Sequence, residues 1–263
     1  MQIRHIDRPV YFEETATSCR DYYIPYIEQN IPVKFGPKFR VMEVGCGIGG
    51  ILSIFAAMKC KVTGIDLHGP SIETARMLFE EKGLQGTFVR SDIFDYRDTE
   101  SYDLIILHDA LEHIPQKERL MLHLKAFLKE DGILYLGFPA WQMPFGGHQQ
   151  MAKSQFIANC PYIHLLPRPL FRMVFKIFGE KDSTIKSFLE IRDTRITIEG
   201  FNKLVAATGF RIINQRLYFI NPNYKVKFGL KPRILSPAIG KIPYLRNYFT
   251  TTCYCLLAKQ PVI

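Results

Sequence analysis

The amino-acid sequence predicts an α/β protein in which a doubly wound, mostly parallel seven-stranded sheet carries helices on both faces and ends in a C-terminal antiparallel strand. Short apolar runs rich in β-branched residues alternate with helix-like stretches through the first half of the chain. Such alternation is typical of parallel strands joined by right-handed crossovers. A glycine-rich turn follows the first apolar run, as it does at the ligand-binding edge of many sheets of this kind.

The order of the elements follows from apolar periodicity and from the glycines and prolines between the apolar runs. Helical segments open the chain between residues 9 and 31 and are expected to end at Pro25 and Pro32. The expected helices of the sheet domain cover 48–58, 70–82, 116–129 and 197–208. The expected strands cover 39–44, 61–66, 86–90, 103–108, 132–138, 210–219 and 248–258.

At 263 residues the chain is expected to form a single domain. Its parts are an N-terminal helical segment at 1–35 and a ligand-binding core at 36–139. The alternation breaks after this core, so residues 140–196 are expected to form a cap inserted after strand five. Residues 197–263 complete the sheet and contain a basic, proline-containing insert at 221–244.

Composition excludes several classes of protein. With 47% apolar and 22% charged residues the chain is not expected to be disordered. No apolar run approaches the ~18 residues that a membrane-spanning helix needs, and the N-terminal residues lack the apolar stretch of a signal peptide. We therefore expect a cytoplasmic protein with reduced cysteines, and peripheral attachment at the inner face of the membrane stays open.

The formal net charge of +9 is concentrated in the C-terminal part of the chain. No acidic residue follows Glu199, whereas ten lysines and arginines do, so residues 1–199 carry a net charge of about −1. An anionic substrate or an anionic surface would suit this excess. A solvated basic face without a partner explains it equally well.

The glycine turn is the first motif that points to a ligand. The strand that contains Glu43 runs directly into Gly45-Cys46-Gly47-Ile48-Gly49-Gly50, and glycines there let the backbone approach a ligand beside the start of a helix. The next strand ends at Asp66, where a carboxylate can accept hydrogen bonds from both hydroxyls of a ribose. These two features alone would suit NAD as well as other nucleoside cofactors.

Two further motifs separate the cofactors. Asp92 follows the third strand, and the fourth strand continues into His108-Asp109-Ala110-Leu111-Glu112-His113. With these motifs in order over residues 39–138, the chain resembles the class I S-adenosylmethionine-dependent methyltransferases, which have a Rossmann-like fold. The likeness is strongest to the small-molecule and quinone-biosynthesis group, and it covers the first half of the chain but not the inserts.

The resemblance implies S-adenosyl-L-methionine as the cofactor. By this resemblance Glu43 and the turn backbone hold the methionine amino group, Asp66 holds the ribose, and Asp92 and Ile93 bind the adenine beside Leu67. Carboxylates suit this ligand because it carries an amine and hydroxyls but no phosphate. Taken singly, Asp66 could be a helix cap and Asp92 a turn residue. The expected cofactor-binding residues are Glu43, Gly45, Cys46, Gly47, Gly49, Asp66, Leu67, Asp92, Ile93 and His108.

A methyl transfer needs an acceptor aligned with the sulfonium and, for a hydroxyl, a group that takes its proton. The candidate catalytic residues are His148, His113 and Asp109, and for His148 a loop histidine bonded to backbone is the alternative. The run from Asp109 to His113 is also similar to the Glu-x-x-Glu-His set that binds a divalent ion in some quinone O-methyltransferases and RNA-end methyltransferases. Aspartate replaces its first glutamate and shortens the reach, so the metal stays unknown.

The expected cap contains an amphipathic helix at Arg168 to Phe178. At about 100° per residue, Arg168, Arg172 and Lys176 share one side and seven apolar side chains fill the other. Such a helix either docks on the domain or lies in a membrane interface. The segment 164–178 is therefore a candidate for peripheral membrane contact and for a lid over an amphipathic acceptor.

The sequence favours O-methylation of a small-molecule or lipid-linked acceptor. An RNA methyltransferase that uses the basic C-terminal region is an alternative, and a non-catalytic S-adenosylmethionine-binding module is another. Nucleic acid is disfavoured because no Asn/Asp-Pro-Pro-Tyr-like box follows the fourth strand and no cysteine lies near strands four and five. The sequence does not indicate the acceptor or the oligomeric state.

Overall fold

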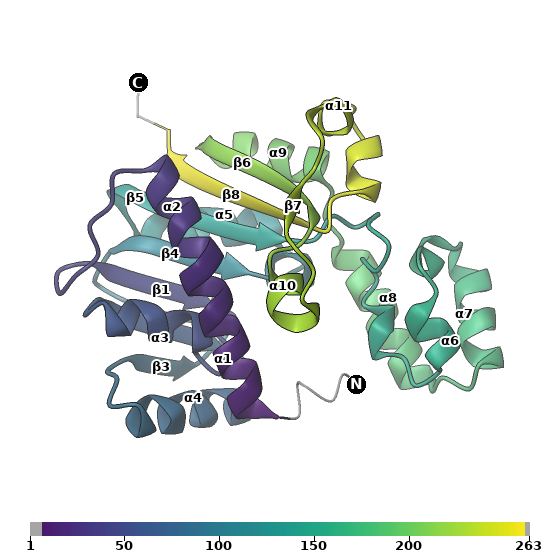
Figure 1. Ribbon diagram of the computed structural model, residues 1–263, viewed down its shortest axis with the longest axis horizontal. Coiled ribbons are helices and arrows are strands. Elements are labelled where there is room, and N and C mark those ends of the chain that lie inside the picture. Colours follow the sequence, from purple (N-terminus) through teal and green to yellow (C-terminus); the bar gives the residue numbers. More distant parts are fainter. Residues whose placement is uncertain (1–6, 261–263) are drawn as a thin grey trace.

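A computed structural model describes residues 7–260 and shows one eight-stranded sheet with helices on both faces (Figure 1). The strands lie in the order β3-β2-β1-β4-β5-β8-β6-β7. Their bounds are β1 (Arg40–Val44), β2 (Lys61–Asp66), β3 (Thr87–Arg90), β4 (Tyr102–His108), β5 (Leu128–Phe138), β6 (Phe210–Ile220), β7 (Arg233–Ile234) and β8 (Thr252–Lys259).

The topology confirms the predicted doubly wound sheet. Neighbouring strands from β3 to β5 are parallel, and β8 lies antiparallel between β5 and β6. The predicted count of seven strands was one short, because the two-residue β7 pairs with β6 at the outer edge. A strand of two residues leaves no apolar alternation in the sequence that would reveal it.

The helices occupy the positions that the periodicity predicted, together with several short ones in the inserts. Short 3-10 helices cover Leu111–His113, Gln149–Met151, Ile163–Leu165 and Leu245–Tyr248. The α-helices are α1 (Arg8–Ser18), α2 (Ile24–Asn30), α3 (Gly50–Ala57), α4 (Gly69–Glu81), α5 (Lys117–Phe127), α6 (Gln155–Asn159), α7 (Arg168–Ile177), α8 (Asp182–Thr194), α9 (Ile198–Ala207), α10 (Asn223–Phe228) and α11 (Pro237–Gly240).

The N-terminal segment differs from the prediction that Pro25 ends a helix. A π-helical turn at Cys19–Tyr23 joins α1 to α2 without a break, and Pro25 lies in the first turn of α2. A proline there costs little, because the first N–H groups of a helix have no partner within it. The π turn, which is common at functional sites, brings Tyr23 into the centre of the fold.

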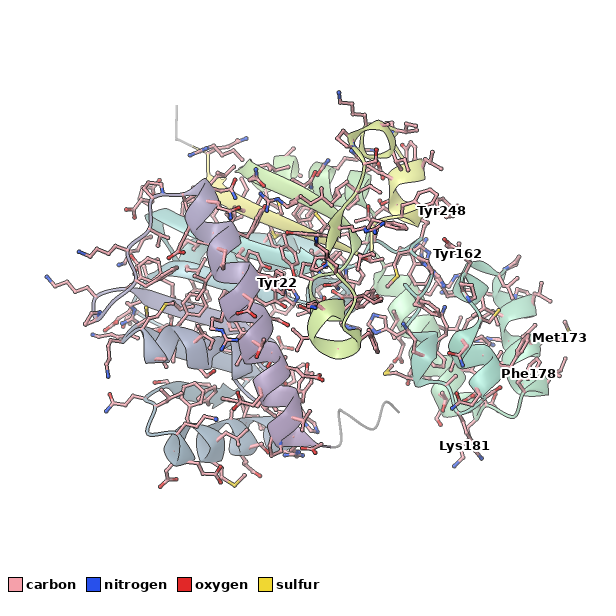
Figure 2. All side chains as sticks on the ribbon, in the orientation of Figure 1. Tyr22, Tyr162, Met173, Phe178, Lys181 and Tyr248 are labelled. Carbon is pink, nitrogen blue, oxygen red and sulfur yellow. The ribbon has the colours of Figure 1, made fainter. Side chains whose placement is uncertain are left out.

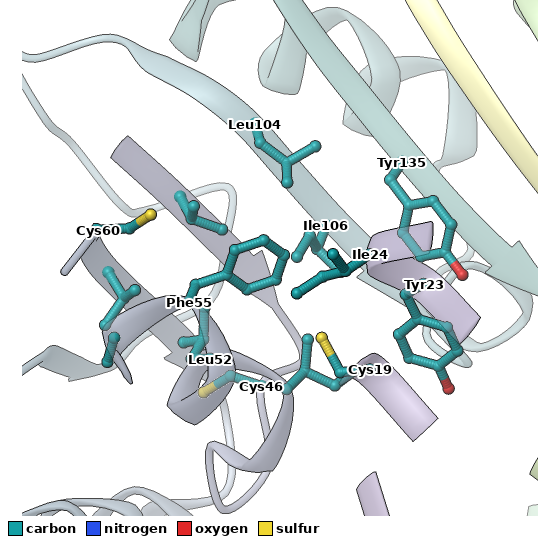
Figure 3. Close-up of a cluster of buried hydrophobic side chains, with 14 of the residues drawn as sticks. Cys19, Tyr23, Ile24, Cys46, Leu52, Phe55, Cys60, Leu104, Ile106 and Tyr135 are labelled. Atoms are coloured by element: carbon teal, nitrogen blue, oxygen red, sulfur yellow. The ribbon is translucent and has the colours of Figure 1, made fainter. Parts of the chain in front are cut away.

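The two faces of the sheet carry separate apolar cores. One lies under α1, α2, α3 and α4, where Phe55, Ile24 and Cys19 pack against Leu104 and Ile106 of the sheet (Figure 3). The other lies under α5 and α9. Together they hold the central strands rigidly, so the loops at the carboxyl ends of those strands start from fixed positions.

The expected cap has a small core of its own beside the sheet (Figure 1). Phe171, Phe175 and Phe188 are buried at its centre. Its two ends meet where the Trp141 N–H donates to the Ile196 carbonyl at 2.8 Å. The cap therefore leaves and rejoins the sheet domain at adjacent points. Across residues 7–260, no helix has the length and apolar character needed to cross a membrane.

Candidate functional site

The glycine turn after β1 is folded back onto the end of β2. The N–H groups of Gly45 and Cys46 both donate to the Ile65 carbonyl, at 2.8 and 3.1 Å. Gly45 and Gly47 have φ values of 75° and 53°, in the left-handed region that glycine enters most readily. The turn therefore exposes backbone at the carboxyl edge of the sheet.

Asp66 joins this turn to the start of α4. One carboxylate oxygen accepts from the Gly47 N–H and the other from the His68 N–H, both at 2.8 Å. Each oxygen has a second lone pair that these bonds do not use. The carboxylate therefore fixes the turn and retains acceptor capacity for two hydroxyl groups.

Glu43 is the buried acid of the site. Its side chain is 3% exposed, and its Oε2 atom accepts no hydrogen bond from any residue between 7 and 260. Burial, followed by the neighbouring charge of Asp66, raises the pKa of Glu43 well above its usual value. A buried acceptor without a donor is costly. An amine-bearing ligand, such as the methionine end of S-adenosylmethionine, would supply the missing donor.

A cavity lies over the glycine turn and Glu43, with Asp66 outside its lining. It is covered by two helices, α1 and α10, that the sequence did not associate with the site. The described residues that line it come from the glycine turn, the ends of β1 and β4, α1, the π turn and α10. Tyr11, Glu14, Thr15 and Ser18 follow one another at the spacing of a single helix face, which is the signal that sequence reasoning missed. The lining comprises Tyr11, Glu14, Thr15, Ser18, Tyr23, Glu43, Gly45, Cys46, Gly47, Ile48, Gly50, Ile51, His108, Asp109, Asn223 and Lys227.

The close approach of α1 depends on the last glycine of the turn. A Cβ atom on Gly50 would meet the Thr15 hydroxyl and would lie 2.6 Å from the Phe12 carbonyl oxygen. The backbone of α1 therefore rests directly on the first turn of α3. Gly49 has a different role, because a Cβ there would meet the Phe88 ring at 3.0 Å, and Gly49 does not line the cavity.

The other expected cofactor residues lie outside the cavity, at the ends of β2 and β3. Leu67 is 67% exposed, whereas Ile93 is buried. Asp92 accepts from the Phe94 N–H at 2.9 Å, and the Ser91 N–H donates to the Asp66 carbonyl at 3.2 Å. These contacts place the adenine candidates on the open edge next to Asp66.

His108 is enclosed by tyrosines. Its Nε2 atom lies 2.9 Å from the Tyr23 hydroxyl, which itself donates to Asn223 Oδ1 at 2.8 Å. Because that hydroxyl has one proton, His108 donates from Nε2, and its Nδ1 atom faces the Tyr135 hydroxyl at 3.4 Å. Burial lowers the pKa of His108. The ring is therefore a neutral support of the cavity wall.

Gly137 of β5 makes room for this ring, since a Cβ at that position would run into the His108 side chain. We expect Gly137→Ala to lower the free energy of unfolding by about 1–3 kcal/mol through overpacking, as measured by urea denaturation. Gly36→Ala is the control, because nothing lies within 4 Å of its Cβ position. Equal stability of the two variants would show that the ring can shift.

Beyond His108 lie Asp109 and a group of three possible metal ligands. Asp109 has a φ of 49° and a half-exposed side chain on the cavity wall. His113 and His148 meet edge to face with ring centroids 4.9 Å apart. One ligand atom from each of Glu112, His113 and His148 lies within 4.8 Å of the others. His148 arrives from the loop after β5, so its sequence position did not reveal this grouping.

The chemistry of this cluster fits a divalent cation. Both Glu112 oxygens are buried without a hydrogen bond from the described part of the chain. Burial and then the Asp109 charge raise the pKa of Glu112, whereas burial lowers the pKa of His113 and brings that of His148 to about 4. Neutral imidazoles and a carboxylate are metal ligands. A cation would satisfy the acid and would leave both histidines in their neutral form.

Comparison with known proteins shows the family to which the chain belongs. A family model described as a methyltransferase domain matches residues 36–192, more than half of the chain. The chain is 38% identical over 119 residues to a ubiquinone biosynthesis O-methyltransferase of Actinobacillus pleuropneumoniae serotype 5b (strain L20), covering 43% of this chain and 50% of that protein. The protein of the same name from Rickettsia canadensis (strain McKiel) is 32% identical over 96 residues, covering 36% and 41%. The chain thus spans half or less of these relatives' length.

Solved structures agree on the fold. A S-adenosylmethionine-dependent methyltransferase from Clostridium acetobutylicum ATCC 824 superposes with a TM-score of 0.60 at 12% identity, covering 94% of this chain and 92% of that one. Magnesium protoporphyrin IX methyltransferase from Synechocystis PCC 6803 gives 0.55 at 14% identity, covering 99% and 89%. Because the family match includes the strands that carry the glycine turn and its acidic neighbours, the chain belongs to the class I S-adenosylmethionine-dependent methyltransferase family.

Proposed function

We propose that this protein transfers the methyl group of S-adenosylmethionine to a hydroxyl oxygen of a small, amphipathic or lipid-linked acceptor, with a divalent cation held by Glu112, His113 and His148. The observation that carries the proposal is the position of Asp109. Its side chain lines the cofactor cavity, and its charge acts on Glu112, His113 and His148. The names of the curated relatives support oxygen as the methylated atom.

In this proposal, different residues of the chain bind different parts of the cofactor. Glu43 receives the amino group, Asp66 the ribose hydroxyls, and the Asp92 region the adenine. The methionine end then lies under α1 and α10, and the sulfonium methyl is directed toward Asp109 and the metal cluster. This arrangement supplies alignment, which is the main requirement of a transfer from a good leaving group.

The acceptor needs to lose a proton as its oxygen attacks. The Asp109 carboxylate, half-exposed on the cavity wall, is the group placed to receive it. A divalent cation bound beside it would lower the pKa of the acceptor hydroxyl. The neutral histidines hold the cluster in place without adding charge of their own.

The test uses labelled S-adenosylmethionine with three acceptors: an alkyl-substituted catechol, the matching aromatic amine and bulk tRNA. The expected product is the O-methyl ether of the catechol, formed with Mg²⁺ or Mn²⁺ and lost on chelation. Transfer to the amine alone, or to tRNA alone, would contradict the proposal. Tight cofactor binding without transfer to any acceptor would favour the non-catalytic module.

Glu43 provides a test of cofactor binding that needs no acceptor. Because the pKa of Glu43 is raised, the free protein retains a proton that the ligand's ammonium group should displace. We expect S-adenosylhomocysteine to bind with proton release and with an affinity that increases as the pH rises above about 4.5, the ordinary pKa of a glutamate. In Glu43→Gln the affinity should fall about tenfold and the proton release should vanish.

Calorimetric titration in two buffers of different ionisation enthalpy measures this proton release. Glutamine keeps the shape of the protonated acid, so the melting temperature of Glu43→Gln without ligand should equal or exceed that of the wild type, which separates a binding defect from misfolding. Unchanged proton release in the variant would place the ammonium group elsewhere.

A further inference from the structure

The apolar side of α7 is wider than the core of the cap requires. Phe171 and Phe175 are buried in that core, at 3% and 0% exposure, whereas Met173 and Ile177 are 52% and 72% exposed. At about 100° per residue the two pairs lie on different sides of the helix. The apolar arc that the sequence shows is therefore divided between the core and the solvent.

A second helix extends the exposed part. Phe156 of α6 stacks on Phe178 with ring centroids 4.7 Å apart and an interplanar angle of 10°. Both rings stay in solvent, at 59% and 41% exposure. Met173 and Phe178 lie on the side of the cap that is remote from the sheet (Figure 2). We call Phe156, Leu170, Met173, Ile177 and Phe178 the outer face of the cap.

Cations border this face. Arg172 is exposed next to Met173, and Lys181 lies just beyond Phe178. Neither forms an ion pair with any acidic side chain in the described part of the chain, whereas Asp182 and Asp193 are paired with Lys176 and Arg168. Over residues 140–196 the chain has eight lysines and arginines against four acids. The border of the outer face is thus positively charged.

We propose that the outer face of the cap binds the surface of an anionic phospholipid bilayer. Exposed apolar side chains beside lysine and arginine are the composition of an interfacial helix. A second copy of the chain fits less well, because an isologous contact would bring the positively charged borders of both copies together. This inference goes beyond the proposed reaction and would bring the site to a surface where lipid-linked acceptors reside.

Flotation with two kinds of vesicle tests the inference. We expect the full chain to float with vesicles of equal phosphatidylglycerol and phosphatidylcholine and to remain unbound with phosphatidylcholine alone. Met173→Asp should lower the bound-to-free ratio about tenfold. The matched control is Met77→Asp on α4, because Met77 is also 52% exposed, and it should float like the wild type.

Charge is tested separately. Arg172→Glu combined with Lys181→Glu should abolish flotation, and 0.5 M salt should weaken that of the wild type. Equal loss in Met173→Asp and Met77→Asp, or equal flotation with neutral vesicles, would overturn the proposal. Concentration-dependent self-association that Met173→Asp removes, without vesicle binding, would assign the face to a second copy. Calorimetric binding of S-adenosylhomocysteine checks that each variant is folded and is independent of methyl transfer.

Discussion

Replacing Asp66 with alanine should lower the affinity for S-adenosylhomocysteine about a hundredfold. The carboxylate can accept from both ribose hydroxyls, and each hydrogen bond to a charged group contributes about 1.5–3 kcal/mol. Two such bonds correspond to roughly a hundredfold or more in the dissociation constant. The variant also removes the acceptor of the Gly47 and His68 N–H groups, so the turn itself loosens.

Calorimetric titration of three variants separates these two effects. Asp66→Asn keeps one acceptor oxygen and should give an intermediate affinity. Asp131→Ala alters an exposed acid of β5 away from the cavity and should bind like the wild type. A loss of less than threefold in Asp66→Ala would mean that the ribose is held by other groups. Melting curves of the unliganded variants report how much the turn has loosened.

Replacing Glu112 with glutamine should abolish the thermal stabilisation that divalent cations confer. At a free concentration of 100 times the dissociation constant, a ligand stabilises the folded state by about 2.7 kcal/mol, which for a chain of this size is a rise of roughly 5–10 °C in melting temperature. Mg²⁺, Mn²⁺ and Zn²⁺ should be compared by differential scanning fluorimetry. His148→Ala should lose the same response, because it removes another ligand of the cluster.

The pH dependence of the free energy of unfolding provides an independent test of the role of Glu112. A carboxyl group whose pKa is raised by folding binds more protons in the folded state, so without metal the free energy of unfolding falls as pH rises above about 4.5. Glu112→Gln should flatten part of that slope. A cation needs the deprotonated acid, so its stabilising effect should increase with pH over the same range. His123→Ala is the control, since that ring bonds the Ile93 carbonyl, packs against phenylalanines and is no part of the cluster. If divalent cations raised the melting temperature equally in all variants, the cation would have to bind elsewhere.

The sequence predicted the strands of the sheet well, and the motifs could be assigned to strand ends because each directly follows an apolar run. Glu43 is the next-to-last residue of β1 and Asp66 is the last of β2, so their proximity follows from parallel pairing alone. The position of α1 over the cavity could not be predicted in this way. Contact between α1 and Gly50 depends on tertiary packing, and its only local sign is a polar helix face in a segment with no glycine motif.

Two other features could not be predicted from the local sequence. His148 meets Glu112 and His113 only because the loop after β5 turns back toward the end of β4, and no spacing rule encodes that path. For α7, the apolar periodicity predicted a helix with one apolar side. How that side is shared between core and solvent depends on the volume of the cap, which Phe171 and Phe175 already fill.

The contact of α1 with the glycine turn has a kinetic consequence. The cavity lies beneath α1 and α10. With the methionine end of the cofactor placed there, as proposed, we expect release of S-adenosylhomocysteine to require one of these helices to move away. Because Gly50 allows α1 to rest on α3 without an intervening side chain, this opening separates two closely fitted backbones. We therefore expect exchange of the spent nucleoside, rather than the methyl transfer itself, to limit the turnover rate.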